Sequence, residues 1–277
     1  MGTNLPKISV VTPSYNQGSY LEQTIQSVLD QDYPNLEYII MDGGSTDGSV
    51  NIIKQYASHL THWETGPDGG QAAAIDKGFS ISTGEILGWL NSDDILLPGC
   101  LSAVARKFPS DPETVALTGR LVRINNNDKP VSVVLPRNTG TLRHMLFYGH
   151  SLPQMATFWR RCAYEKAGGL DTTMEFSFDF DFFVRLRQIG KIFLIPDYLA
   201  AFRLHPSQKS STLQDKRQAE NHLIRERYGC GSFGMISVLR RWLRPMQRIA
   251  DYVAWLKDRA RLEEICEWEN KHTAQKK

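Results

Sequence analysis

Two adjacent carboxylates lie directly after an apolar run, in the sequence Asn91-Ser92-Asp93-Asp94. Neighbouring carboxylates repel each other unless a cation or a proton neutralises one of them. A hard divalent cation such as Mg²⁺ or Mn²⁺ takes oxygen ligands of this kind and keeps positions open for the oxygens of a diphosphate. The alternative interpretation is that Asp93 or Asp94 only caps a helix that begins near Pro98.

Two other polar loops also follow apolar runs and contain groups that suit a nucleotide. In residues 12–16, the ring of Tyr15 can stack on a base and the hydroxyl of Thr12 can bond to that base. In residues 42–47, Asp42 can accept hydrogen bonds from a base or a ribose. Each loop can also be only a turn, directed by a proline in the first case and capping the next helix in the second.

An aromatic run at residues 178–183 contains two acids, Asp179 and Asp181. Because residues two apart do not share a face of a helix, these acids cannot act as one pair. We expect one of them to face a cavity, where it suits a general base, and the other to cap the helix or to pair with Arg185. His205 ends a later apolar run, and its imidazole is either structural or a ligand for a metal or a phosphate.

The first half of the chain alternates short apolar runs, typical of buried strands, with helical patterns. The first helix is predicted to open at a capping box, Ser19-x-x-Glu22, the second is capped by Thr46 or Asp47, and the third spans residues 71–80. This order is typical of a parallel sheet with helices on both faces, whose ligands bind at the carboxyl ends of the strands. The three polar loops all follow such ends. Strands are predicted at residues 8–12, 36–41, 61–64 and 86–90.

The second half of the chain has a more mixed pattern, with a helix predicted at residues 180–189 and a helical pattern from about residue 214 onward. We therefore predict an α/β fold with a mostly parallel sheet flanked by helices, and a helical extension at residues 213–277. Strands are predicted at residues 115–124, 131–135, 155–159, 192–195 and 198–204.

Composition narrows the class of protein. The 277 residues are 41% hydrophobic and 22% charged, as in ordinary globular proteins, and a net charge of +2 gives no basic surface for nucleic acid. The four cysteines lie far apart, which predicts neither a zinc site nor a disulfide framework but a reducing, cytoplasmic location. The sequence predicts no spanning helix and no secretory signal. The G-x-S-x-G and Walker motifs are absent, which disfavours hydrolases and kinases.

Residues 233–250 combine apolar side chains with four arginines and contain no acid. Such a segment can form an amphipathic helix in peripheral contact with an anionic membrane surface. It can equally pack on the rest of the chain and expose a basic face to solvent. The arginines are Arg240, Arg241, Arg244 and Arg248.

Taken together, these motifs resemble the family 2 inverting glycosyltransferases, which have a GT-A fold. The resemblance covers roughly residues 8–211 and implies one domain at residues 1–212, with a donor half at about residues 1–110 and an acceptor half at about residues 111–212. It rests on the segments SVVTPSYNQGSYLEQTIQSVLDQ, YIIMDGGSTDGS, GEILGWLNSDD, AGGLD, FDFDFFVRL and FRLHP, in this order.

The resemblance also implies roles for individual residues. Asp179 matches the acid expected to deprotonate the acceptor hydroxyl, but Phe178 stands where the family often has Glu, so Asp181 stays an alternative. The divalent cation, Mg²⁺ or Mn²⁺, is expected at Asp94 and His205. The nucleotide-sugar donor is expected to contact Thr12, Ser14, Tyr15, Asp42 and Asp93.

The implied reaction moves a sugar from a nucleoside-diphosphate donor to an acceptor hydroxyl, with inversion at the anomeric carbon. The acceptor would be a glycan or a glycolipid, in polysaccharide or glycolipid biosynthesis, and no nucleic acid partner is expected. A non-catalytic nucleotide-sugar or carbohydrate-binding protein of the same fold and a nucleotide-sugar hydrolase are the alternatives. Asp68, Gln71 and Lys77 are close enough in sequence to the first strands to contact the donor as well.

Overall fold

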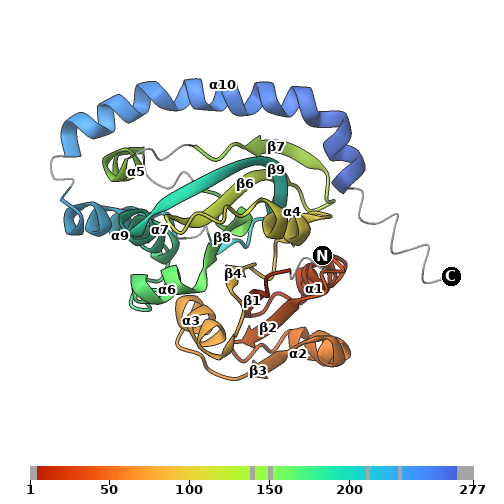
Figure 1. Cartoon of the computed structure of the whole chain (residues 1–277). Helices are drawn as coiled ribbons and strands as arrows, with labels where there is room; N and C mark the ends of the chain where they lie inside the picture. The colour runs from red at the N-terminus through yellow and green to blue at the C-terminus, as the bar shows by residue number, and fades with distance from the viewer. Residues whose placement is uncertain (1–4, 138–140, 149–151, 210–212, 230–232, 267–277) are drawn as a thin grey trace.

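The computed structural model describes residues 5–137, 141–148, 152–209, 213–229 and 233–266. Its N-terminal half alternates strands with helices, as the sequence predicts (Figure 1). These elements are β1 (Ile8–Ser14), α1 (Gly18–Leu29), β2 (Leu36–Asp42), α2 (Ser49–Tyr56), the 3₁₀ helix η1 (Ala57–His59), β3 (His62–Thr65), α3 (Gln71–Ile81) and β4 (Ile86–Trp89).

The second half adds shorter strands and more helices. Two of its predicted strands, residues 192–195 and 198–204, form a single long strand, β9. The elements are β5 (Ile95–Leu96), α4 (Cys100–Lys107), β6 (Thr114–Ile124), β7 (Pro130–Val134), α5 (Leu142–Tyr148), the 3₁₀ helix η2 (Gln154–Ala156), β8 (Thr157–Arg160), α6 (Arg161–Ala167), α7 (Phe178–Ile189), β9 (Lys191–Arg203), α9 (Gln214–Arg227) and α10 (Phe233–Cys266).

All nine strands of the described residues belong to one sheet, in the order β3-β2-β1-β4-β8-β6-β9-β5, with β7 paired to β6. The four strands of the N-terminal half are parallel. In the second half only β6 and β9 are parallel, and the other pairings are antiparallel. The α/β fold with flanking helices is therefore confirmed, and its parallel character is concentrated in the half that contains the first three polar loops.

The strands of the N-terminal half alternate their side chains between two apolar cores, because successive residues of a strand point to opposite faces of the sheet. Val10 and Tyr38 pack with α1, α2 and α4 on one face. Val11 and Ile39 pack with α3 and α7 on the other. Figure 1 shows α1 and α2 on one side of this half-sheet and α3 on the other. With both faces buried, the strands read as continuous apolar runs, as in other parallel sheets.

The predicted capping box at the start of α1 is wrong. The helix begins at Gly18, and the carboxylate of Glu22 accepts a hydrogen bond from the hydroxyl of Tyr56 at 3.0 Å. The exposed N–H groups at this helix end are bound from a neighbouring loop, because Gly18 N–H donates to Asp47 Oδ2 at 2.8 Å. A contact between segments about thirty residues apart thus replaces the local cap. Asp47 also accepts from the Ser49 N–H at 3.1 Å, and Gly48 is the N-cap of α2.

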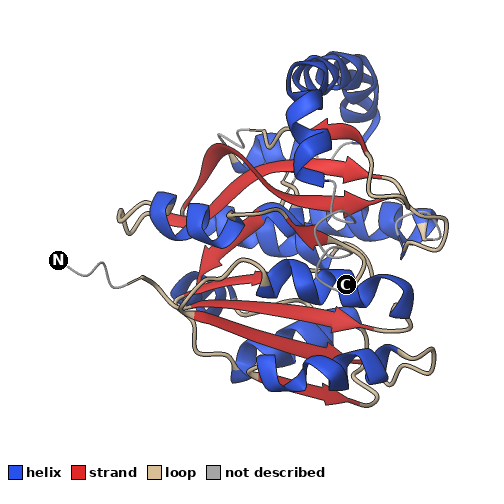
Figure 2. Cartoon of the chain, turned by 90° about the vertical axis from the view of Figure 1, so that its right-hand side faces the viewer, coloured by secondary structure: helices blue, strands red, loops and turns tan. Residues whose placement is uncertain are grey.

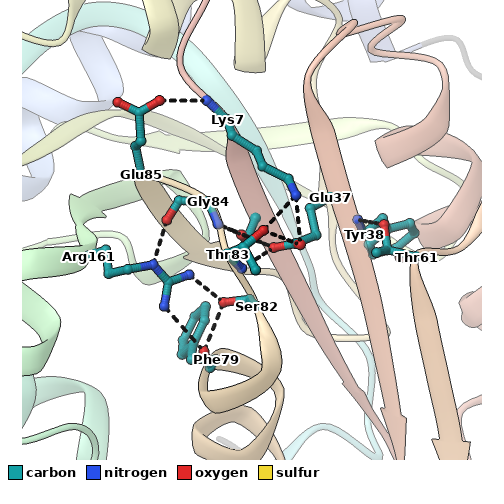
Figure 3. A network of polar contacts seen from close by, with 11 residues as sticks. Lys7, Glu37, Tyr38, Thr61, Phe79, Ser82, Thr83, Gly84, Glu85 and Arg161 are labelled. Carbon is teal, nitrogen blue, oxygen red and sulfur yellow. Dashed lines mark hydrogen bonds and ion pairs between the residues drawn. The ribbon is translucent and has the colours of Figure 1, made fainter.

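A polar network joins the amino-terminal ends of β1 and β2 to the segment before β4 (Figure 3). The Glu37 carboxylate is buried and accepts hydrogen bonds from Ser9 Oγ at 2.5 Å and from Thr83 N–H at 2.6 Å. Lys7 Nζ lies 3.0 Å from its Oε1. Gly84 fits this crowded point because a Cβ there would lie 2.3 Å from Ser9 Oγ. The network holds the sheet together at the end opposite to the polar loops.

We expect Glu37→Gln to lower the free energy of unfolding by about 2 kcal/mol at neutral pH. Burial alone would raise the pKa of Glu37, but the hydrogen bonds from Ser9 and Thr83 outweigh it and lower the pKa to about 2. A lowered pKa means that the stabilisation is complete above the unfolded-state pKa and is lost as the pH falls toward 2. Urea unfolding at pH 7 and pH 3.5 measures the effect, which should be smaller at the lower pH.

The matched control for this prediction is Glu85→Gln, which changes an exposed carboxylate at the same end of the sheet. Glu85 accepts the Lys7 N–H at 3.3 Å, and a glutamine oxygen can still accept it. It should leave the unfolding midpoint almost unchanged at both pH values. Equal unfolding curves for the parent protein and the Glu37 variant at pH 7 would show that the network adds no stability.

Candidate active site

A cleft of about 1720 Å³ lies at the carboxyl ends of the parallel strands and continues between α7, the segment after β9 and α10. Four residues predicted for the site line it together: Ser14, Tyr15, Asp93 and Asp179. Ser14 ends β1, Tyr15 and Asp93 follow strands of the N-terminal half, and Asp179 belongs to α7 in the second half. The cleft thus brings an acid from the loop after β4 and an acid from α7 to a shared space.

Asp93 lines the cleft and contacts His205, whose side chain has no exposed surface and lies behind the lining. His205 Nε2 lies 3.0 Å from Asp93 Oδ2, and its Nδ1 lies 2.9 Å from Ser207 Oγ. The Tyr20 ring covers the imidazole, with 4.7 Å between ring centroids. The contact joins the loop after β4 to the segment after β9, two segments 112 residues apart in sequence.

Asp94 is completely buried behind its neighbour. Its Oδ1 accepts the Arg203 N–H at 3.1 Å, and its Oδ2 accepts from Asn91 Nδ2 at 3.3 Å. Burial, and next the charge of Asp93, raise the pKa of Asp94 well above its usual value. Neither acid caps α4, whose N-cap is Gly99, so the capping alternative is wrong.

Arg203 holds the acidic loop, residues 91–94 after β4, in place. It was not predicted as a site residue. Its guanidinium donates to the Asp93 carbonyl at 3.1 Å, forms an ion pair with Asp128 and lies 5.1 Å from the centroid of the Tyr20 ring. It also bonds to Gln23 of α1. A buried arginine needs partners on every side, and here they come from three different segments. The signal in the sequence is an arginine directly after the apolar run at residues 198–202.

Thr12 and Asp42 lie behind the cleft rather than in its lining. The Thr12 hydroxyl is buried against the Tyr38 hydroxyl at 3.1 Å. The Asp42 carboxylate accepts from the Ser45 N–H at 2.9 Å and from Thr65 Oγ1 at 2.7 Å. In this conformation Asp42 therefore organises its own loop, as the turn interpretation proposes.

Gly43 continues this loop into the wall of the cleft. A Cβ at this position would lie 2.9 Å from Asp68 Oδ2 and 3.3 Å from Tyr15 Cδ2. The absence of a side chain therefore lets the backbone pass between two residues that line the cleft. The Tyr15 side chain is 63% exposed and free of the core, so its ring is available to a planar ligand.

The two acids of the aromatic run separate as predicted. Asp181 is fully buried and pairs with Arg185 at 2.8 Å and with Arg227 at 3.0 Å. Asp179 lines the cleft, and its Oδ1 accepts the Phe180 N–H at 2.6 Å. Asp179 lies in the first turn of α7, where the helix dipole favours a negative charge.

Lys209 is the main cleft residue that the sequence reasoning missed. Its ammonium group donates to Gln71 Oε1 at 3.1 Å and to the Glu175 carbonyl. Gln71 Nε2 donates in turn to Asn91 Oδ1 at 2.9 Å. Burial lowers the pKa of Lys209, while the charges of Glu220 and Asp179 act in the opposite direction. This chain of contacts links the loop after β4 to the segment that precedes α7.

The three residues expected near the donor on grounds of sequence position have different outcomes. Asp68 and Gln71 line the cleft. Lys77 instead forms an ion pair with Glu64, and both side chains are partly exposed at the surface.

Comparison with known proteins identifies the relatives of this chain. The sequence model described as glycosyl transferase family 2 matches residues 9–167. TuaG of Bacillus subtilis, named for teichuronic acid biosynthesis, is 42% identical over 94 residues, which are 32% of this chain and 36% of TuaG. A glycosyltransferase of a Nostoc species, alr2836, is 34% identical over 134 residues, 45% of this chain and 39% of that protein. The chain thus spans less than half the length of these two relatives.

One solved structure has a similar fold over most of the chain. It is the mannosyltransferase PcManGT from Pyrobaculum calidifontis in complex with GDP-Man and Mn²⁺, with a TM-score of 0.65 and 18% sequence identity. The similarity covers 92% of this chain and 76% of PcManGT. At this level of identity the similarity shows the fold alone.

Proposed function

The chain belongs to glycosyl transferase family 2, and on this premise we propose that it transfers a sugar from a nucleoside-diphosphate donor to an acceptor hydroxyl, with inversion at the anomeric carbon. The observation that carries the proposal is the shared cleft. Asp93, from the loop after β4, and Asp179, from α7, both line it. Two acids from separate segments suit a reaction that binds a diphosphate at one end and removes a proton at the other.

On the donor side, the exposed ring of Tyr15 is positioned to stack on the base, with Ser14 beside it in the cleft wall. Aromatic stacking tolerates different bases, so it leaves the nucleotide open. We propose that Thr12 and Asp42 support this wall from behind and contact the nucleotide only after the loop after β2 changes its hydrogen bonds.

The residues at the acidic loop fit a divalent cation. A carboxylate oxygen and an imidazole nitrogen are both ligands for Mn²⁺, and Asp93 Oδ2 and His205 Nε2 already converge at 3.0 Å. No cluster of three or more such ligands occurs in the part of the chain that the structure describes, so diphosphate oxygens and water would complete the coordination. When bound, the cation would neutralise charge on the departing diphosphate.

We assign the cation to Asp93 and His205 rather than to Asp94. The side chains of Asp94 and His205 both lack exposed surface. The oxygens of Asp94 already accept hydrogen bonds from Arg203 and Asn91, whereas His205 Nε2 faces the partly exposed carboxylate of Asp93. The prediction that Asp94 is a direct ligand requires these bonds to be replaced. Arg203 would then act indirectly, by holding the loop that presents Asp93.

On the acceptor side, Asp179 serves as the general base. The acceptor oxygen forms a bond to the anomeric carbon as the bond from that carbon to the diphosphate breaks, and the acceptor proton moves to the Asp179 carboxylate. The hydrogen bond from the Phe180 N–H keeps this carboxylate oriented, and the start of α7 stabilises its charge. No side chain needs to form a covalent intermediate.

The acceptor class is inferred from the name of a relative. TuaG is named for the synthesis of a polysaccharide, and we propose a glycan or glycolipid acceptor and a role in polysaccharide biosynthesis for this chain. A cytoplasmic location is proposed for the same reason as before, the spacing of the cysteines. The division into a domain at residues 1–212 and an extension at 213–277 also stays a proposal.

The direct test measures release of nucleoside diphosphate from UDP-, GDP- and dTDP-sugars with Mg²⁺ or Mn²⁺, with and without added glycan acceptors. We expect one donor to bind and its turnover to rise when an acceptor is present. Equal turnover without acceptor would indicate a hydrolase. Tight donor binding without turnover for any acceptor would indicate a binding protein of the same fold.

A further inference from the structure

The exposed side of α10 carries a stripe of large apolar side chains. The stripe consists of Ile249, Tyr252, Val253 and Leu256, which are 62%, 57%, 58% and 51% exposed. Their spacing of three, one and three residues places them on one face of the helix. Single exposed apolar residues are normal at a protein surface, but four on one helix face form a contiguous patch that favours an apolar contact.

The two acids within this stretch of α10 point the other way. Asp251 accepts hydrogen bonds from Arg137 at 2.9 and 3.0 Å. Asp258 accepts from the Tyr198 hydroxyl at 2.9 Å. The first contact joins the helix to the segment after β7 and the second joins it to β9, and Leu262 of the helix is fully buried. Figure 1 shows α10 running across the outside of the molecule above β7.

Basic side chains flank the stripe. Arg248, Lys257, Arg259 and Arg261 are all exposed, and between residues 248 and 262 the described acids are only the two that point inward. The next two residues of the helix, Glu263 and Glu264, are also exposed, and Glu263 pairs with Arg259 at 2.7 Å. The sequence before this stretch is also basic, with Arg240, Arg241 and Arg244, whose side chains lie outside the described residues. An apolar stripe with basic edges and inward acids is complementary to a surface that is apolar within and anionic outside.

We propose that the exposed face of α10, residues 248–261, docks on an anionic lipid bilayer, with the stripe in the apolar boundary and the basic residues at the headgroups. Among the described residues, none of the helices could span a bilayer. An amphipathic helix with a charged face lies in the plane of the interface. Tyr252 lies in the stripe and has the apolar ring and polar tip that favour the membrane–water interface. A second copy of the chain fits the face less well, because an isologous contact would bring its basic edges together.

The position of α10 gives the contact a functional consequence. Asp251, on the inner side of the helix, also lines the cleft. A bilayer bound to the outer side would therefore lie close to the open end of the cleft, which suits an acceptor carried by a lipid. This consequence rests on the proposed sugar transfer, whereas docking on the bilayer does not.

Flotation with vesicles tests the docking. The parent protein should float with vesicles of equal parts phosphatidylglycerol and phosphatidylcholine, stay in solution with pure phosphatidylcholine, and bind less at about 0.5 M salt. The double variant Ile249→Gln with Leu256→Gln should lose about tenfold in partition to the anionic vesicles. The matched control, Ile81→Gln with Leu223→Gln, replaces two apolar residues that are 43% and 48% exposed elsewhere, and should bind like the parent.

Several outcomes would overturn the proposal. The first is that the parent protein does not float with the anionic vesicles, and the second is that the α10 variant floats as well as the parent. The third is a dimer, seen by light scattering, that the α10 variant no longer forms; this result would mean that the stripe binds a second copy of the chain. Circular dichroism of each variant separates a lost surface from a lost fold, and nucleoside diphosphate release in the absence of vesicles tests the proposed transfer separately.

Discussion

Asp179→Asn should lower the turnover of sugar transfer by about three orders of magnitude, within the range that a positioned general base contributes. Asparagine keeps the shape of the side chain and can still accept the Phe180 N–H, but it cannot take the acceptor proton. Donor affinity should change by less than about twofold, because the proposed donor contacts lie at the other end of the cleft. Steady-state kinetics and donor titration measure the two effects separately.

Asp181→Asn provides the comparison, because this acid belongs to the same turn of α7 but is buried among Arg185, Arg227 and Tyr228. Removing one charge from such a network should lower the stability by about 3 kcal/mol. The fraction that remains folded should turn over at close to the parent rate. If Asp179→Asn kept full turnover while Asp181→Asn lost it, the two assignments would have to be exchanged.

The contrast between these acids was predictable because helical periodicity is a local property. Residues two apart in a helix point in different directions, so one of them had to leave the cleft, and Arg185 one turn later offered a partner. The strand ends were predictable for a similar reason, since continuous apolar runs indicate strands buried on both faces. Asp93, Tyr15 and Ser14 therefore fell in the cleft.

Asp93 and Asp94 were harder to distinguish because they are neighbours in a loop without a regular period. Which carboxylate faces the cleft depends on Arg203, whose N–H binds Asp94 from a strand about 110 residues away. Lys209 was missed for the same reason, since its partner Gln71 is 138 residues distant. Contacts of this kind arise from the packing of the two halves, and no spacing within one segment encodes them.

Asp93→Asn should weaken cation-dependent donor binding by about a hundredfold, whereas Asp94→Asn should change it by less than about threefold. The first variant removes the carboxylate that contacts His205, and the second alters a buried group that contacts Arg203 and Asn91. Asp94→Asn should instead lower the free energy of unfolding by about 1–2 kcal/mol, because one of its hydrogen bonds loses its acceptor. Calorimetric donor titration with Mn²⁺ and after chelation with EDTA, together with urea unfolding, measures both quantities.

The two neighbouring acids serve as controls for each other, because both substitutions remove one carboxylate from the same loop. His205→Ala should follow Asp93→Asn, and in both variants the difference between titrations with Mn²⁺ and with EDTA should nearly vanish. A parent protein whose donor affinity is unchanged by EDTA would show that no cation takes part in donor binding. A hundredfold loss in Asp94→Asn at unchanged stability would mean that the loop after β4 rearranges when the donor binds, and that the buried carboxylate then turns toward the cation.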